Sequence, residues 1–399
     1  MLLGTLCILL VISLLQCALA LGARRAVPAI SSLSERDAPP PARWPTLSVI
    51  VPAKDEAEHL EPALRSKLAS DYPSLQIVVV DDRSTDATPS ILRRMLDERT
   101  TDTGPELRVA RVDALPEGWL GKLHALQRGF EASSGEWVLL ADADVHIAPG
   151  VLRTLVAHAE AQSIDMIAVF PEMRPVSPII DASIAGLLRV LCLSARLWKA
   201  NDDDAKLGLG VGAFNLVRRR WIEETKAFEL LRMEVADDVS LGVLLAQSGA
   251  RTRLFAGRKD VSLVFQPTVG ALLRSSDKGA GMLGWGLFKP LAIASAPVLV
   301  ELALPLAGLV RGGLSALVAA LALAAITVTH LLLTAHFAGP MAGATLWPLA
   351  HLFNAFAISR AGWLAWRRQG VVWRGTFYPR AVVDAGRRLD LGAMRVRTP

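Results

Sequence analysis

The chain has 399 residues, 52% of them hydrophobic and 20% charged, with a formal net charge of +5 at pH 7. Its length leaves room for more than one unit, and its apolar share excludes an ordinary soluble domain. The net charge is small and owes much to an arginine-rich C-terminal segment, so we expect no nucleic-acid partner. The composition predicts a protein that lies partly in lipid.

The N-terminal stretch Met1 to Gly22 carries no charged side chain. At about 1.5 Å per residue it is long enough to cross a hydrocarbon core of about 30 Å. Arg24 and Arg25 follow, and the positive-inside rule places them in the cytoplasm. Ala18-Leu19-Ala20 could serve as a cleavage site, so a secretory signal is the alternative. Because no basic residue precedes the apolar run, we favour an uncleaved anchor.

Ser31 to Pro45 is rich in serine, proline and charge, which is typical of a linker. Short apolar runs then alternate with helical patterns, and Pro52 ends the first run. Such an alternation predicts an α/β fold with a doubly wound parallel sheet, in which ligands bind beyond the carboxyl ends of the strands. The expected strands are Leu47 to Val51, Gln76 to Val80, Leu107 to Val112 and the run from Trp137, and the expected helices are Glu61 to Ser70, Thr88 to Arg99 and Gly121 to Ala132.

Asp81 and Asp82 end the second apolar run, QIVVVDD. A carboxylate at that position can accept hydrogen bonds from a ribose or from the ring N–H of a uracil. The alternative is local, because Ser84, Thr85 or Asp86 can cap the helix that follows. Both interpretations can hold together.

The segment Gly118-Trp119-Leu120-Gly121-Lys122 opens a helix. Free backbone N–H groups, glycines that permit close approach and a lysine charge would suit a diphosphate. The alternative is a turn followed by a surface lysine.

Asp142 and Asp144 end the run WVLLADAD, one residue apart. In a strand, side chains two residues apart point to the same face, so both acids would be presented together. Mg²⁺ or Mn²⁺, held by one or two carboxylates and by phosphate oxygens, would neutralise a nucleotide diphosphate. Asp-Ala-Asp suits such a site, and the alternative is a solvated turn after a strand.

Asp237 and Asp238 precede a predicted helix over Leu241 to Ala246. One of these aspartates can act as a general base on an acceptor hydroxyl. The alternative is an acidic pair that the dipole of the helix favours. The three acidic clusters suggest one site that is assembled from the ends of strands.

Near the C-terminus, Pro290 to Val310 holds one charged residue, Glu301. Gly312 to Ser359 holds no charged residue if its histidines are counted as neutral. This is enough apolar length for two or three segments. From Arg360 to Pro399 there are nine Arg and two Asp, which favours a cytoplasmic tail. We expect Pro290 to Val310 to lie at the membrane interface or to form a re-entrant segment. This leaves two segments after the domain that cross the membrane fully.

The three cysteines offer neither a disulfide framework nor zinc spacing, which suits a domain in the reducing cytoplasm. We therefore expect a multi-pass protein of the cell (inner) membrane with a cytoplasmic domain. The predicted organisation is an anchor over 1–22, a linker over 23–45, a domain over 46–288, a membrane region over 289–366 and a basic tail over 367–399.

Several motifs together resemble one family. VPAKDEAEHL, VVVDDRSTDAT, LPEGWLGKLHALQRG, LLADAD, GVGAFNLVRR, ADDVSLG and VVWRGTFY occur in the order found in membrane-bound family 2 glycosyltransferases. The chain resembles in particular the hopanoid-associated glycosyltransferases, with carotenoid and ceramide glycosyltransferases as relatives. The resemblance runs from about Leu47 to Tyr378.

This resemblance implies a GT-A fold, that is, a Rossmann-like nucleotide-diphospho-sugar transferase domain. It also implies inverting transfer of a sugar from a nucleotide-sugar donor, UDP-linked, to a lipid or hopanoid-type hydroxyl at the membrane, with Mg²⁺ or Mn²⁺ as cofactor. By position, the resemblance assigns nucleotide-sugar binding to Pro52, Ala53, Glu56, Asp81, Asp82, Lys122 and Asp142, the metal to Asp144 and Asp142, and catalysis to Asp238 as base with Asp237 beside it.

The chain departs from many relatives in lacking a Gln-x-x-Arg-Trp motif after the base. Arg274 or Lys278 could supply the positive charge that this motif provides. The absence argues against processive polymer synthesis. Two other classes stay open: another nucleotide-using transferase on a similar sheet, and a non-catalytic membrane protein that keeps the fold.

Overall fold

The structure is a computed structural model that describes residues 1–99, 104–203, 205, 207–283, 288–390 and 392–398. It divides into two compact units, and each is described by itself. The helical unit comprises Met1–Val27, Met173–Lys199 and Val264–Val383. The sheet unit comprises Pro28–Glu172, Ala200–Leu263 and Asp384–Pro399. The predicted domain over 46–288 and the predicted tail over 367–399 are thus each divided between the two units.

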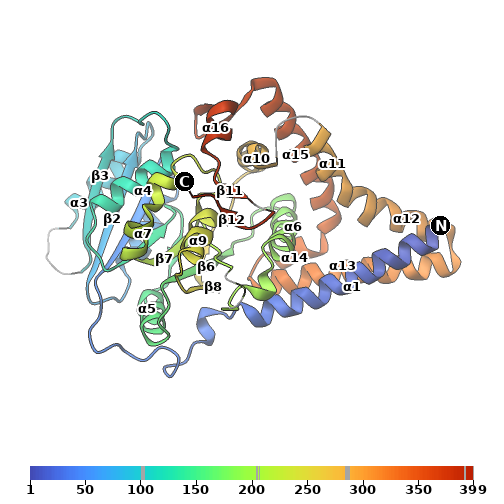
Figure 1. Ribbon diagram of the computed structural model, residues 1–399, viewed down its shortest axis with the longest axis horizontal. Helices are drawn as coiled ribbons and strands as arrows, with labels where there is room; N and C mark the ends of the chain where they lie inside the picture. Colours follow the sequence, from blue (N-terminus) through green and yellow to red (C-terminus); the bar gives the residue numbers. More distant parts are fainter. Residues whose placement is uncertain (100–103, 204, 206, 284–287, 391, 399) are drawn as a thin grey trace. The chain divides into compact units, whose positions relative to one another are not determined.

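The first half of the sheet unit alternates strands and helices as predicted (Figure 1). The neighbouring strands of this half pair in parallel, in the order β3-β2-β1-β4. All eight residues of β2 are buried, as expected for a central parallel strand. The elements are β1 (Leu47–Ala53), α2 (Leu60–Leu68), β2 (Leu75–Asp82), α3 (Thr88–Asp97), β3 (Glu106–Val112), α4 (Gly121–Glu131) and β4 (Trp137–Ala141).

Pro52 does not end β1, which continues to Ala53. The pairing of β1 with β4 stops at Ile50, while its pairing with β2 runs on to the end of the strand. A proline lacks only the backbone donor, so it fits where one neighbouring strand has already ended.

The second half of the sheet corrects the expectation of a purely parallel sheet. β7 (Phe214–Arg218) runs antiparallel to β4 and to β6 (Met166–Met173), and β5 (His146–Ile147) runs antiparallel to β8 (Thr252–Leu263). Between β6 and β7 the chain builds a helix that belongs to the other unit. β7 then runs back along β6, because the two strands are antiparallel. An apolar run in the sequence carries no direction, so this mixed sheet could not be seen from the pattern alone.

Helix α4 lies close against the sheet because it carries a glycine at the contact. A Cβ on Gly129 would lie 2.4 Å from Cγ2 of Ile50 and 3.0 Å from Cγ2 of Val80. Ala125 of the same helix joins a buried cluster with Val80 and Val112. This close packing sets the position of the first residues of α4, which carry Lys122.

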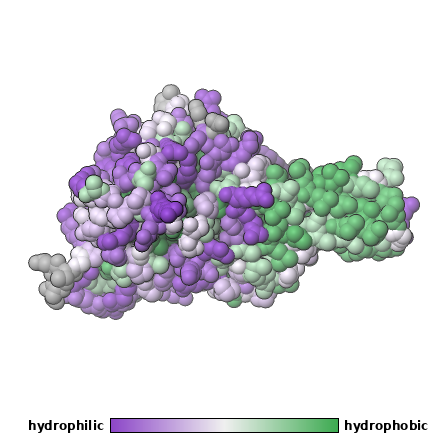
Figure 2. All heavy atoms as spheres, turned by 90° about the horizontal axis from the view of Figure 1, so that it is seen from below, coloured by the Kyte–Doolittle hydropathy of each residue, from purple (hydrophilic) through white to green (hydrophobic). Residues whose placement is uncertain are grey.

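The helical unit holds the long apolar helices. Three of them are long and apolar enough to cross a membrane: Leu2–Ala26, Phe288–Arg311 and Gly313–His336. Hydrophobic surface covers the helices near the N-terminus (Figure 2). The elements are α1 (Leu2–Ala26), α6 (Pro178–Ser194), η2 (Leu197–Lys199), α10 (Val269–Leu283), α11 (Phe288–Pro297), the π-helical turn η3 (Val298–Ala303), α12 (Leu304–Arg311), α13 (Gly313–His336), α14 (Met341–Thr345), α15 (Trp347–Arg368), β9 (Gly370–Trp373) and β10 (Thr376–Pro379), with α16 (Arg380–Gly386) at the boundary between the units.

The segment expected to lie at the interface is a helical run of 24 residues, Phe288–Arg311, that is long enough to span. Its turn to α13 uses Gly312 and Gly313, both at positive φ (76° and 58°). α1 packs along α13, and His336 Nε2 lies 2.7 Å from the carbonyl oxygen of Val27. The arginine end of α1 and the histidine end of α13 therefore lie together (Figure 1).

A buried polar network joins four elements of the helical unit. Arg189 of α6 donates from both terminal nitrogens to the carboxylate of Glu301, at 2.8 and 2.6 Å. Arg189 also donates to Oε1 of Gln16 in α1 at 2.5 Å, and His351 Nε2 of α15 lies 2.8 Å from Glu301 Oε2. The Arg189 and Glu301 side chains are only 8% and 14% exposed. Glu301, the one acid of its apolar segment, is thus paired inside the unit.

Candidate active site

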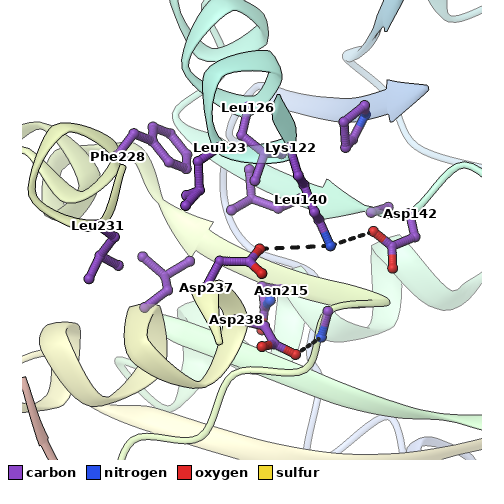
Figure 3. A pocket seen from close by; sticks show the side chains of 14 residues that line it. Lys122, Leu123, Leu126, Leu140, Asp142, Asn215, Phe228, Leu231, Asp237 and Asp238 are labelled. Atoms are coloured by element: carbon purple, nitrogen blue, oxygen red, sulfur yellow. Dashed lines mark hydrogen bonds and ion pairs between the residues drawn. The ribbon is translucent and has the colours of Figure 1, made fainter. Parts of the chain in front are cut away.

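A hollow of about 370 Å³, including its part open to solvent, lies beyond the carboxyl ends of the parallel strands in the sheet unit. One side of it is polar and the other is apolar (Figure 3). The lining residues are Pro52, Lys122, Leu123, Leu126, Leu140, Ala141, Asp142, Gly212, Asn215, Phe228, Leu231, Asp237, Asp238 and Leu241.

Lys122 is at the centre of the polar side. Its Nζ lies 2.7 Å from Oδ1 of Asp142 and 3.8 Å from Oδ2 of Asp237 (Figure 3). The side chain is 20% exposed, so it is not the surface lysine of the alternative interpretation. Burial opposes its charge, but the carboxylates of Asp142, Asp237 and Asp238 outweigh burial and raise the pKa of Lys122 above its ordinary value. Lys122 is therefore a fixed cation among three acids.

Asp237 and Asp238 stand in the first turn of α9 (Asp237–Gln247), where the helix dipole favours them. They also line the hollow, so both interpretations of this pair hold. Asp238 Oδ2 accepts a hydrogen bond from the backbone N–H of Gly212 at 2.7 Å. A Cβ on Gly212 would lie 3.1 Å from that oxygen, 3.6 Å from Lys122 Nζ and 3.7 Å from Asp142 Oδ2. Of the predicted residues, Asp142, Asp238 and Lys122 therefore converge on one point.

Gly208 and Gly210 let the loop that leads to Gly212 lie directly on α9. A Cβ on Gly210 would be 1.9 Å from the carbonyl oxygen of Asp238, and one on Gly208 would be 1.8 Å from that of Gly242. Asn215 fixes the same loop by exchanging two hydrogen bonds with the backbone of Val211. No role was predicted for these residues, although the spacing Gly-x-Gly-x-Gly was a visible signal of close backbone approach.

Asp142 and Asp144 are not held on one face by a strand, because β4 ends at Ala141. Both acids lie in the turn that follows, which agrees with the local alternative and leaves the metal interpretation open. Burial, with Asp142 and Glu56 nearby, raises the pKa of Asp144 to about 6. A carboxylate that is disfavoured by burial and by neighbouring acids would gain from a bound cation.

This donor set fits a divalent ion that takes its remaining ligands from a phosphate and from water. Among the residues that the structure describes, no group of three or more His, Cys, Asp or Glu is arranged to hold a metal ion. Asp144 and Asp142 would thus form half of a coordination shell, and the donor molecule would have to supply more of it.

Lys67 lies beneath this turn and was not predicted. It is fully buried on α2, and its Nζ donates to the carbonyl oxygens of Ala63 and Val145. Burial lowers the pKa of Lys67 to about 8, against the opposing effect of Asp144 and Asp142. A lysine inside a helical apolar pattern usually lies at a surface, so the pattern alone did not reveal it.

Asp81 and Asp82 are both buried at the end of β2. Asp82 Oδ1 lies 2.7 Å from Nε of Arg83, and Oδ2 would be 2.7 Å from a Cβ on Gly121, so Asp82 abuts the start of α4. Asp81 Oδ1 accepts a hydrogen bond from the N–H of Ser84 at 3.1 Å.

The local interpretation of the turn after β2 also holds. Asp86 accepts hydrogen bonds from the N–H groups of Thr88 and Ala57, at 2.9 and 3.0 Å. Of the predicted site residues, Pro52, Lys122, Asp142, Asp237 and Asp238 line the hollow, whereas Ala53, Glu56, Asp81, Asp82 and Asp144 do not.

Arg274 and Lys278, the expected substitutes for the missing motif, both lie on α10 in the helical unit. Lys278 Nζ lies 4.1 Å from the ring centroid of Trp373 in β9. This cation–π contact ties α10 to the VVWRGTFY segment.

Residues 48–224 match the family described as Glycosyl transferase family 2. The chain is 31% identical over 117 residues to the Beta-monoglucosyldiacylglycerol synthase of Synechocystis sp. (strain ATCC 27184 / PCC 6803 / Kazusa), which covers 29% of this chain and 23% of the relative. It is 29% identical over 102 residues to the 4,4'-diaponeurosporenoate glycosyltransferase of Staphylococcus haemolyticus (strain JCSC1435), which covers 26% of this chain and 25% of the relative.

A solved structure, the mannosyltransferase PcManGT from Pyrobaculum calidifontis in complex with GDP-Man and Mn²⁺, is similar at 22% identity and a TM-score of 0.49, covering 92% of this chain and 98% of that one. The chain spans less than half the length of the curated relatives that it matches, from 23% to 44%. The mixed α/β sheet unit has the GT-A-type architecture expected from the motifs.

Proposed function

We propose that this chain, whose residues 48–224 match Glycosyl transferase family 2, transfers a sugar from a nucleotide-sugar donor to a hydroxyl of a membrane lipid. The observation that carries the proposal is the convergence of Lys122, Asp142 and Asp238 around Gly212. A lysine between acids at the carboxyl ends of parallel strands can hold a diphosphate and leave a carboxylate free to act as a base.

The mechanism is a single displacement. A carboxylate oxygen of Asp238 takes the proton of the acceptor hydroxyl as the hydroxyl oxygen attacks the anomeric carbon of the sugar. The bond from the anomeric carbon to the donor phosphate breaks, the nucleoside diphosphate leaves with the electron pair, and the configuration inverts. Asp238 is given this role by its position in the ADDVSLG motif, whereas Asp237 lies beside Lys122, with its Oδ2 3.8 Å from Nζ.

Lys122 stabilises the negative charge that develops on the departing diphosphate. A bound Mg²⁺ or Mn²⁺ would supply further Lewis-acid stabilisation, with Asp144 and Asp142 as the residues that hold it. Pro52, Ala53, Glu56, Asp81 and Asp82 are proposed to line the base and ribose of a UDP-linked donor. This assignment rests on the motif positions and on the place of these residues at the ends of β1 and β2, with Glu56 in the turn after β1.

A lipid acceptor agrees with the candidate spans of the helical unit and with the apolar wall of the hollow. Two relatives are named as a Beta-monoglucosyldiacylglycerol synthase and a 4,4'-diaponeurosporenoate glycosyltransferase. The narrower proposal of a hopanoid-type acceptor rests on the sequence resemblance alone.

The first test compares the two aspartates. We expect Asp238→Asn to abolish transfer of radiolabel from a UDP-sugar into extractable lipid, because the amide cannot take the proton. Asp237→Asn should keep measurable transfer. Equal activity of Asp238→Asn and the unchanged protein would remove the proposed base, and release of pyrophosphate from a nucleoside triphosphate would instead indicate a nucleotidyltransferase.

The three candidate spans also favour one topology. If Arg24 and Arg25 lie in the cytoplasm, Phe288–Arg311 crosses outward and Gly313–His336 crosses back. The arginine-rich tail then lies in the cytoplasm without a re-entrant segment. The predicted number of two spans after the domain is kept, but Phe288–Arg311 is one of them.

We expect a reporter that is active only outside the cytoplasm to be active when fused after Gly312 and inactive when fused after residue 398. A cytoplasmic fluorescent reporter should give the opposite pattern. An active external reporter at residue 398 would show that the chain crosses the membrane once more, with α15 as the next candidate.

A further inference from the structure

The end of the chain belongs to the sheet unit and forms what we call the C-terminal strap, residues 384–398 without residue 391. Two short strands, β11 (Leu389–Asp390) and β12 (Arg395–Val396), pair antiparallel within it. Leu389 and Val396 are buried, so the strap is packed against the unit. The predicted basic tail over 367–399 includes this packed segment.

The strap is bonded to the loop that leads into Asp237 and Asp238. Glu234, which is 3% exposed, accepts hydrogen bonds on one oxygen from the N–H groups of Arg388 and Leu389, at 2.7 and 2.9 Å. Hydrogen bonds to an ionised acceptor are about twice as strong as neutral ones. Gly386 lies against the same loop, since a Cβ there would be 2.2 Å from Cβ of Met233.

The loop is also bonded to the helix that carries the lysine. It connects α8 (Ala227–Leu231) to α9, and the carbonyl oxygen of Arg232 accepts a hydrogen bond from the N–H of Leu120 at 2.8 Å. Leu120 is the residue before α4, so Lys122 follows two residues later. One short loop therefore sets the position of Lys122 on one side and of Asp238 on the other.

A second attachment holds the far end of the strap. The N–H of Val396 donates to Oε1 of Gln247 at 3.1 Å, and β12 packs on α9 (Figure 1). α9 is thus held near both of its ends, by Glu234 just before its first residue and by Gln247 at its last. The strap lies along the helix whose first turn carries the proposed base.

We propose that Glu234 is a positioning residue and that the C-terminal strap holds Asp238 and Lys122 at the relative positions that sugar transfer requires. The inference rests on the proposed function, because it concerns the rate of that reaction. Without the Glu234 bonds, the loop loses its fixed point, and a shift of about 1 Å in a catalytic group can cost about 100-fold in rate. The affinity for the donor should change little, because the other residues proposed to bind it stay in place.

The test uses full-length variants. Glu234→Ala should lower kcat of lipid glycosylation by about 10- to 100-fold while KM for the donor changes little. Glu234→Gln should keep most of the rate, because its amide oxygen can accept both backbone hydrogen bonds. Glu224→Ala, the loss of an exposed acid earlier in the same unit, should leave kcat unchanged.

A second readout does not depend on catalysis. The strap carries several arginines, so trypsin should cut it faster in Glu234→Ala than in Glu234→Gln or the unchanged protein. An unchanged kcat in Glu234→Ala, despite faster cleavage of the strap, would overturn the positioning role. So would an equal loss of kcat in the Ala and Gln variants. If the unchanged protein transferred no sugar, the proposed function would fail, and the trypsin comparison would still test the attachment of the strap.

Discussion

Lys122→Met is expected to lower the rate of sugar transfer by about 100- to 1,000-fold, the usual effect of removing one fixed group that stabilises transition-state charge. The substitution removes the cation that lies 2.7 Å from Asp142 and within ion-pair distance of Asp237. Three carboxylates would then face the place of the leaving diphosphate without a protein charge to offset them. Steady-state transfer to lipid, with kcat and KM for the donor determined separately, measures the loss.

Two controls separate this effect from misfolding. Lys259→Met removes an exposed lysine of the same unit and should leave transfer unchanged. Adding Asp237→Asn to Lys122→Met relieves the repulsion between acids, so it should recover thermal stability but not activity. Full transfer by folded Lys122→Met would show that the lysine serves the structure alone and that the diphosphate is held elsewhere.

Glu301→Gln is expected to destabilise the helical unit by about 3–5 kcal/mol, as found when one partner of a buried ion pair is removed. The neutral side chain would leave the charge of Arg189 buried without its carboxylate, and only one of the two oxygens that Arg189 and His351 contact would remain an acceptor. In detergent, the variant should aggregate at a lower temperature than the unchanged protein when both are followed by size-exclusion chromatography.

The paired control removes the stranded charge. Arg189→Met combined with Glu301→Leu should recover most of the lost stability, because apolar residues can replace a buried pair at little cost. Glu229→Gln, which changes an exposed acid of the sheet unit, should have no effect on the same measurement. If Glu301→Gln were as stable as the unchanged protein, the network would be unimportant for packing.

The parallel half of the sheet was readable from the chain because its order depends on local signals. Short apolar runs, helical spacing and acidic residues after the runs placed β1, β2, β4 and α4 close to their observed ends. The direction of β7 was not readable, because an apolar run does not show whether a strand pairs parallel or antiparallel.

The candidate site was predictable to the extent that it is built from charged residues at the ends of elements. Asp142, Lys122 and Asp238 were identified by that rule, and the hollow brings them together. Lys67 and Glu234 were missed because each is a buried charge whose partners are backbone groups distant in sequence. Nothing in their own neighbourhoods distinguishes them from surface residues.

The sequence by itself determined which segments are apolar enough for a membrane, which residues carry charge, and the order of strands and helices, because these follow from side-chain chemistry and local spacing. Only the tertiary structure decided that Glu301 is paired, that the pleat of a strand does not align Asp142 with Asp144, and that the last residues of the chain hold the loop before Asp238. These features depend on contacts between residues far apart in the chain, and no local pattern specifies which distant backbone group a buried side chain will meet.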